Sequence, residues 1–193
     1  MGFRPRPILI AAVSGLAAAA IAILVVAALA NDEPTYDGEF VLDQPGVFQE
    51  PLSEVNDDLS GLTLPDIDLT DINGDPQSLR EYAGKPLIIN VWFSNCAPCR
   101  RELRDFAVVH AELGAEIQFV GIDPFDTVEA MQRFASERGV TYDLLRDTER
   151  EFSNEIGIVA YPVTLFVSAD GEILRQTGEI DADALRAAIL ELF

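Results

Sequence analysis

The sequence has little of three things from which functional sites are often built: cysteine, histidine and positive charge. It contains two cysteines, Cys96 and Cys99, and one histidine, His110. Two cysteines exclude a framework of several disulfides, and one histidine excludes a histidine-rich metal site. Lysine and arginine number 13 against 33 aspartates and glutamates, which gives a net charge of −20. This excess of negative charge argues against nucleic-acid binding, where cationic side chains replace the counterions of phosphate.

The first 30 residues predict a membrane anchor. Residues 8–30 contain no charged side chain, and as a helix they would be about 34 Å long, enough to cross a hydrocarbon core of roughly 30 Å. Arg4 and Arg6 come before this run, so the positive-inside rule leaves residues 1–7 in the cytoplasm and the rest outside the cytoplasmic membrane. The alternative is a cleaved signal peptide, because Ala28-Leu29-Ala30 resembles a cleavage site, although the apolar run is longer than the usual signal. In both cases the remainder of the chain is exported.

The remaining chain divides into an acidic linker and a folded domain. Residues 31–60 contain nine acidic residues, no basic residue and three prolines, which is typical of a solvated linker. Residues 61–193 alternate apolar segments with segments of helical periodicity. We expect strands at 62–69, 87–93, 117–122, 163–167 and 172–176, and helices at 97–113, 127–138, 149–155 and 181–192, the last capped by Asp181. This order predicts an α/β domain in which helices cover both faces of a mixed central sheet.

Cys96 and Cys99 stand where an expected strand gives way to an expected helix. The free N–H groups and the dipole of a helix N-terminus favour an anion and lower the pKa of the first thiol. Cys99 follows about one turn later, near enough for a disulfide, and Pro98 suits a first helical turn. Zinc would need two more ligands, haem attachment would need histidine in place of Arg100, and a purely structural disulfide would gain little entropy from so small a loop. We therefore predict a redox-active Cys96–Cys99 pair and no metal, with Cys96 as the exposed attacking thiol and Cys99 as the shielded resolving thiol.

The chain from about Leu62 to Phe193 resembles a known family. It is similar to the membrane-anchored, extracytoplasmic thiol-disulfide oxidoreductases of the TlpA/ResA/CcmG type, which have a thioredoxin-like fold. The segments that carry the resemblance are Trp92-Phe93-Ser94-Asn95-Cys96-Ala97-Pro98-Cys99-Arg100-Arg101-Glu102-Leu103, Leu64-Pro65-Asp66, the Asn73-Gly74 turn, Gly84-Lys85-Pro86 and Tyr161-Pro162-Val163-Thr164. The resemblance implies a cis peptide bond before Pro162, with this proline against the Cys96 sulfur. Ser94-Asn95 departs from the family, which usually has Trp or Thr-Trp before the first cysteine, so contacts with a partner are expected to differ.

Glu102 is expected on the core-facing side of the helix that follows the cysteines. At 100° per residue it falls at the edge of an arc shared by Cys99, Leu103, Phe106, Val109, His110 and Leu113. Burial should raise its pKa and let it exchange protons with Cys99, which the resemblance also implies. The alternative is a first-turn glutamate that only interacts with the helix dipole. Asn90 cannot titrate, and His110 is expected in the core or at its rim. The residues expected to shape the substrate-binding site are Trp92, Pro98, Tyr161 and Pro162.

These features predict an enzyme that crosses the cytoplasmic membrane once, has its folded domain on the extracytoplasmic side and uses no cofactor. The resemblance implies a reductant of protein disulfides, with apocytochrome c among its partners and a membrane thiol carrier as electron donor. The alternatives are an oxidant that forms disulfides in secreted proteins and a thioredoxin-fold binding module with inert cysteines. Peroxide reduction is disfavoured because Phe93, and not threonine, stands three residues before Cys96.

Overall fold

The computed structural model describes residues 56–193. The predicted anchor at residues 8–30 and most of the acidic linker lie outside the described residues. Within residues 56–193 no helix combines the length and the apolar character that crossing a bilayer requires.

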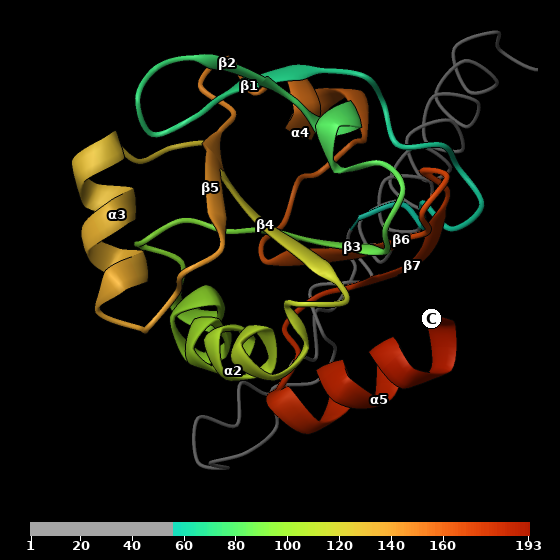
Figure 1. The fold of residues 1–193 in the computed structure, drawn as a ribbon. Coiled ribbons are helices and arrows are strands. Elements are labelled where there is room, and N and C mark those ends of the chain that lie inside the picture. Colours follow the sequence, from blue (N-terminus) through green and yellow to red (C-terminus); the bar gives the residue numbers. More distant parts are fainter. Residues whose placement is uncertain (1–55) are drawn as a thin grey trace, which may run out of the picture. The chain divides into compact units, whose positions relative to one another are not determined.

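A mixed sheet of seven strands forms the centre of the described domain (Figure 1). The strands are β1 (Asp68–Thr70), β2 (Pro76–Ser78), β3 (Leu87–Val91), β4 (Gln118–Asp123), β5 (Asp143–Arg146), β6 (Val163–Val167) and β7 (Ile173–Thr177). Their order across the sheet is β2-β1-β5-β4-β3-β6-β7. The pairs β3–β4 and β4–β5 are parallel, whereas β6 runs antiparallel to both β3 and β7. The carboxyl ends of β3 and β4 therefore meet at one edge, where a site can be assembled from both.

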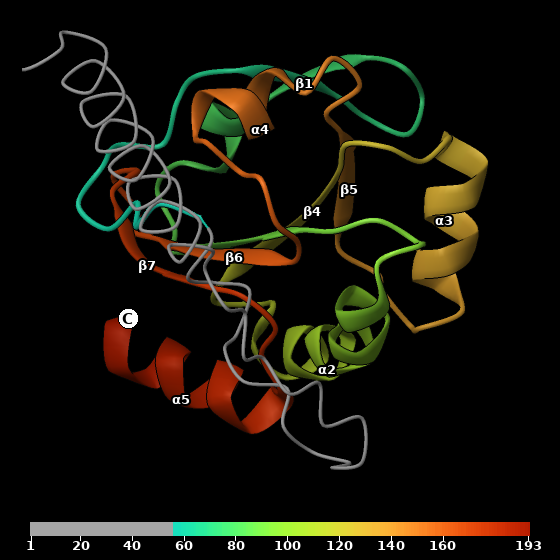
Figure 2. The same ribbon diagram turned by 180° about the vertical axis from the view of Figure 1, so that it is seen from behind.

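Helices cover both faces of this sheet, as the sequence predicts (Figures 1 and 2). The helical segments are η2 (Leu79–Tyr82), α2 (Ala97–Leu113), α3 (Val128–Ser136), α4 (Glu151–Glu155) and α5 (Ala182–Leu192). Buried side chains of α2, α3 and α5 form one core with Ile88 and Phe166 from the sheet. Buried side chains of η2 and α4 form a second core with Leu87 and Ile89. Since β3 is covered on both sides, all five of its residues are buried, which explains its nearly unbroken apolar sequence.

Most predicted elements are confirmed. Helix α2 has the predicted bounds, 97–113, and so does β6, 163–167. Asp181 caps α5 by accepting a hydrogen bond of 2.9 Å from the N–H of Ala184. The strands β6 and β7 form the predicted hairpin, with Gly171 in its turn at a φ of 91°.

The predicted strand at residues 62–69 is wrong as one continuous element, because its first part lies beside the outer strand β7 and its last part belongs to β1, between β2 and β5. Residues near Leu62 and Leu64 exchange backbone hydrogen bonds with the start of the β7 hairpin, and only residues 68–70 form β1. Pro65 lies between the two parts and has no N–H to continue a ladder. The short strands β2 and β5 were not predicted, since segments of three and four residues carry too little periodicity.

Candidate active site

The two cysteines lie at the beginning of α2, directly after the loop that leaves β3. Cys96 is the N-cap of the helix and forms a disulfide with Cys99, with an S–S distance of 2.01 Å. The N–H of Cys99 donates a hydrogen bond to Cys96 Sγ over 3.3 Å. Cys96 retains 6% of its accessible surface and Cys99 retains none, so Cys96 is much less exposed than the sequence suggested. Pro98 occupies the first turn of α2, where an intrahelical N–H bond is not required.

Glu102 lies one turn beyond Cys99 and is only 2% exposed, although the sequence placed it at the edge of the buried arc. Its Oε1 accepts a hydrogen bond of 2.9 Å from Nδ2 of Asn90, and its Oε2 accepts one of 3.1 Å from the N–H of Ile180. Burial raises the pKa of Glu102 to about 8, and the two hydrogen bonds, which favour the carboxylate, offset only part of this effect. The carboxyl group is therefore mostly protonated at neutral pH and can both donate and accept a proton close to the cysteines.

Pro162 is at the same end of the sheet as the disulfide. The peptide bond between Tyr161 and Pro162 is cis, and Pro162 is buried. Val163 pairs with Val91, the last residue of β3, so the loops that hold Pro162 and Cys96 leave neighbouring strands at one edge.

Aromatic side chains lie above and below this edge. Tyr161 meets the rings of Phe93 and Phe125 edge to face, each at a centroid distance of 5.5 Å. Phe125 is about half exposed, which makes this cluster part of the surface around the site. Trp92 is fully buried and stacks obliquely on Phe134 at 5.4 Å. It therefore supports the cysteine loop from within the core and presents no surface to a partner.

Two aspartates that were not predicted from the sequence lie at the end of β4, where Asp126 holds the cysteine loop and Asp123 holds the segment that carries Asp126. Asp126 accepts hydrogen bonds from the N–H of Ser94 at 2.6 Å and from its hydroxyl at 2.8 Å. Asp123 is fully buried and accepts the N–H groups of Phe125 and Asp126, each at 2.9 Å. Burial, and then the neighbouring Asp126 carboxyl, raise the pKa of Asp123 to about 7. A signal was available in the sequence, because Asp123 directly follows the strand expected at 117–122 and Asp126 comes three residues later.

His110 packs further along α2, where it is partly buried. Its ring meets Phe119 and Tyr142 edge to face, each at 5.3 Å, so it is a rim residue as expected.

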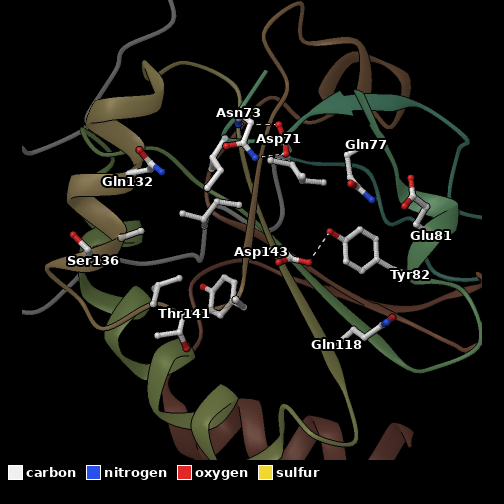
Figure 3. A pocket seen from close by; sticks show the side chains of 16 residues that line it. Asp71, Asn73, Gln77, Glu81, Tyr82, Gln118, Gln132, Ser136, Thr141 and Asp143 are labelled. Atoms are coloured by element: carbon white, nitrogen blue, oxygen red, sulfur yellow. Dashed lines mark hydrogen bonds between the residues drawn. The ribbon is translucent and has the colours of Figure 1, made fainter. Parts of the chain in front are cut away.

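A cleft of about 760 Å³ lies away from the cysteines, beside β5 and α3 (Figure 3). Amide, hydroxyl and carboxyl groups line it, and the hydroxyl of Tyr82 donates a hydrogen bond of 3.0 Å to Asp143 across it. None of the residues predicted for the redox site belongs to its lining. A search for the functional site by cavity size would therefore not find the residues around the disulfide.

Comparison with known proteins identifies the family of the chain. A model of the AhpC/TSA family matches residues 61–176. The chain belongs to the AhpC/TSA family. Among its relatives, thiol-disulfide oxidoreductase ResA of Geobacillus kaustophilus (strain HTA426) is 31% identical over 117 residues, which are 58% of this chain and 66% of that protein. ResA of Bacillus subtilis (strain 168) is 23% identical over 116 residues, 60% of this chain and 65% of that protein. The chain thus spans just under two thirds of the length of these relatives.

Solved structures confirm a thioredoxin-like α/β fold. A secreted disulfide oxidoreductase of Mycobacterium tuberculosis, homologous to E. coli DsbE, has a TM-score of 0.59 and 25% identity, covering 66% of this chain and 96% of that one. MTB DsbF, solved in mixed oxidised and reduced forms, has a TM-score of 0.61 and 26% identity, covering 68% of this chain and 100% of that one. The thioredoxin domain of a thiol-disulfide oxidoreductase from Bacteroides vulgatus has a TM-score of 0.62 and 20% identity, covering 68% of this chain and 96% of that one. At this identity it supports the fold alone.

Proposed function

We propose that the protein is a thiol-disulfide oxidoreductase that reduces disulfides of other proteins outside the cytoplasmic membrane. One observation carries the proposal: Cys96 Sγ lies at the N-terminus of α2 and accepts the N–H of Cys99. A thiolate at this position is stabilised by that N–H and by the helix dipole, so Cys96 is the thiol of the pair that ionises more easily.

The reaction requires only the two sulfurs of the enzyme and the two of its partner. The Cys96 thiolate attacks one sulfur of the partner disulfide, and the other partner sulfur leaves as a thiolate. The Cys99 thiolate then attacks Cys96 Sγ, which closes the enzyme disulfide and releases the second partner thiolate. Two electrons pass from the enzyme dithiol to the partner, and no metal or organic cofactor takes part.

Glu102 serves the second step in this proposal. Cys99 is fully buried and must lose its proton before it can attack, and burial in apolar surroundings opposes the loss. A carboxyl group with a pKa of about 8, one helical turn away, is suited to take that proton and to return it when the enzyme is reduced again.

The direction of the reaction and its place in the cell belong to the same proposal. The apolar run at residues 8–30, with Arg4 and Arg6 before it, supports a single-pass anchor and an extracytoplasmic domain. The likeness to the TlpA/ResA/CcmG type favours reduction, with apocytochrome c as one substrate and a membrane thiol carrier as electron donor.

The proposed membrane anchor is tested by fractionation. In a membrane fraction from the native cell, the chain should resist a carbonate wash and its domain should be open to external protease. A soluble form that begins at Asn31 would contradict the anchor.

The enzymatic claim is tested by insulin reduction with dithiothreitol as the electron source. The purified full-length chain should accelerate insulin precipitation well above the rate with dithiothreitol alone, and a variant with both cysteines replaced by alanine should not. Equal rates for the wild type and this variant would leave the inert binding module as the correct interpretation.

A further inference from the structure

Arginine side chains gather next to the disulfide, although the chain as a whole has a net charge of −20. A pocket of about 220 Å³ opens between the cysteine loop, α2 and α3. Ser94 and Asn95 line it from the loop, Arg100 lines it from α2, and Arg133 and Arg138 line it from α3 and the segment just after it. The only acidic residue in the lining is Glu137, so the pocket is positively charged. We call it the arginine pocket.

The rest of the domain leaves most of these arginines without a carboxylate. Within residues 56–193, four other arginines form salt bridges shorter than 3 Å, namely Arg80, Arg101, Arg175 and Arg186. Arg100 and Arg133 form none in this part of the chain, and Arg138 has only a distant contact of 3.7 Å with the exposed Glu137. Arg104, Arg146 and Arg150 also form no salt bridge within residues 56–193, so the distinguishing feature of the pocket is that three arginines without a close carboxylate line it together.

Arg138 is held in place by the core beneath the pocket. Its guanidinium carbon lies 3.5 Å from the ring centre of Phe134, and its Nη1 donates to the Phe134 carbonyl over 3.0 Å. Phe134 in turn packs against Trp92, the residue that supports the cysteine loop. The contact with the carbonyl is an ordinary cap for the end of α3, but it uses one of five N–H groups, and the buried Nε has no partner in the described domain.

The positive charges of the pocket act on one another. Burial lowers the pKa of Arg138, and the nearby charge of Arg100 and, to a smaller extent, that of Arg104 lower it further, whereas Glu137 acts in the opposite direction. An anion placed between these guanidinium groups would relieve this repulsion. Arginine forks match a carboxylate particularly well, because two parallel N–H groups can reach both of its oxygens.

We propose that the arginine pocket binds a carboxylate of the protein partner, from an aspartate or glutamate close to the cysteine that Cys96 attacks. This inference rests on the proposed function and adds a substrate class to it. Ser94 and Asn95 belong to both the pocket and the loop that carries Cys96, so the pocket is within reach of a polypeptide joined to Cys96. A polypeptide substrate supplies carboxylates, which is why we favour this anion over a free phosphate.

The test compares two disulfide-linked peptides that differ only in the residues beside one cysteine, glutamates in one and glutamines in the other. At low salt the full-length protein should reduce the acidic peptide with a kcat/KM about threefold to tenfold higher, the range expected for one or two ion pairs. High salt should reduce this preference. Arg133→Gln should remove most of it, and Arg133→Glu should reverse it. Arg175→Gln changes the net charge equally but lies on β7, paired with Glu191, and should keep the preference.

A second measurement does not depend on the redox reaction. The same two peptides, with serine in place of cysteine, are labelled and their binding is followed by fluorescence anisotropy. Tighter binding of the acidic peptide, lost in Arg133→Gln and kept in Arg175→Gln, would support the pocket even if no reduction occurred. Equal affinity for both peptides, or equal loss in both variants, would overturn the inference while leaving insulin reduction intact. Displacement by inorganic phosphate where sodium chloride of the same ionic strength has no effect would assign the pocket to a small anion and overturn it too.

Discussion

The strands of the central sheet contribute different kinds of buried side chain to its two faces. On the face covered by η2 and α4, the strands contribute aliphatic side chains such as Ile89, Ile122 and Leu165. On the face covered by α2 and α5, Asn90 lies opposite Thr164 on the neighbouring strand and donates hydrogen bonds to both Thr164 and Glu102. Buried polar groups are present on the other face as well, where Ser153 of α4 donates a hydrogen bond to Asp147, but the buried carboxyl group next to the cysteines lies on the face covered by α2 and α5.

The face that carries Glu102 contributes to the reaction, whereas the aliphatic side chains of the other face contribute mainly to stability. Burying an ionisable group is unfavourable unless its partners replace water, and Glu102 has two such partners. The raised pKa that results is useful for proton exchange but lowers stability whenever the carboxyl ionises. The aliphatic side chains of the face covered by η2 and α4 bury apolar area, and this burial offsets the effect.

The largest expected effect on activity comes from replacing the cysteines. Cys99→Ala should abolish turnover, because the mixed disulfide between Cys96 and a partner then has no internal thiol to resolve it. Adducts sensitive to dithiothreitol should accumulate in the native cell, and mass spectrometry would identify the attached proteins. Cytochrome c precursors would support the reductive role, whereas a broad set of secreted proteins with paired cysteines would favour an oxidant.

Cys96→Ala is the matched variant for this experiment. The remaining thiol, Cys99, is fully buried, so far fewer adducts are expected. Equal trapping by both variants would reverse the roles assigned to the two cysteines.

The aliphatic face should respond in stability and not in chemistry. Ile89 is fully buried between Val120 and Leu165, so Ile89→Ala should lower the free energy of unfolding by about 2–5 kcal/mol. Urea unfolding followed by the fluorescence of the single tryptophan, Trp92, would measure this loss. The pH profile of disulfide exchange should stay the same, because Ile89 points away from the cysteines.

The next residue along β3 provides the contrast. Asn90→Ala removes a hydrogen bond that favours the Glu102 carboxylate, so the pKa of Glu102 should rise and the pH profile should move to higher pH. If Ile89→Ala moved the profile as far as Asn90→Ala does, the division between the two faces would be wrong.

The predictable parts of the structure are those whose signals are local. The strand at 87–91 is readable because both of its faces are covered, and α2 is readable from its periodicity. The cysteine pair lies within one helical turn, so its geometry follows from spacing. The short strand β5 has no such signal, because its place between β1 and β4 depends on pairing with β4 and on one bridge between Thr70 and Arg146.

The support of the site is largely non-local, and this part could not be predicted. The N–H of Ile180 that reaches Glu102 is 78 residues away in sequence, and Asp126 is 32 residues away from Ser94. The direction of the Glu102 pKa shift was predictable from its place on the helix. Its near-complete burial was not, since that depends on how the chain before α5 packs over α2.

A smaller effect is expected when Glu102 is made unable to titrate. The pKa of Glu102 is raised from 4.5 to about 8 in the folded state, so between these values the folded chain holds a proton that the unfolded chain has lost. The stabilising contribution is complete below about pH 4.5 and is lost as the pH rises to 8, with a slope of up to about 1.4 kcal/mol per pH unit. Glu102→Gln should remove this slope, as measured by urea unfolding across the range.

Two further readouts separate Glu102 from other groups. Asp123, whose pKa is also raised, adds a similar slope up to about pH 7, so the difference between the wild type and Glu102→Gln isolates the contribution of Glu102. Exchange catalysed by Glu102→Gln should slow on the order of a hundredfold and should lose the part of its pH dependence that comes from Glu102, whereas the part that comes from the thiols remains. An unchanged rate profile would exclude the proton-exchange role and leave only an interaction with the helix dipole.

The smallest effect should come from the contact that holds the cysteine loop to the end of β4. Asp126→Ala removes two hydrogen bonds to Ser94, and we expect a loss of about 1–3 kcal/mol in stability together with slower attack by Cys96, whose loop is then less well held. Ser94→Ala removes only the hydroxyl contact and keeps the N–H of residue 94 bound to Asp126, so its effect on both quantities should be smaller. Urea unfolding and the rate of mixed-disulfide formation in the Cys99→Ala background would measure the two effects separately. If Asp126→Ala and Ser94→Ala were equally slow in the first step, the backbone contact would have no part in placing Cys96, and the influence of β4 on the site would be limited to stability.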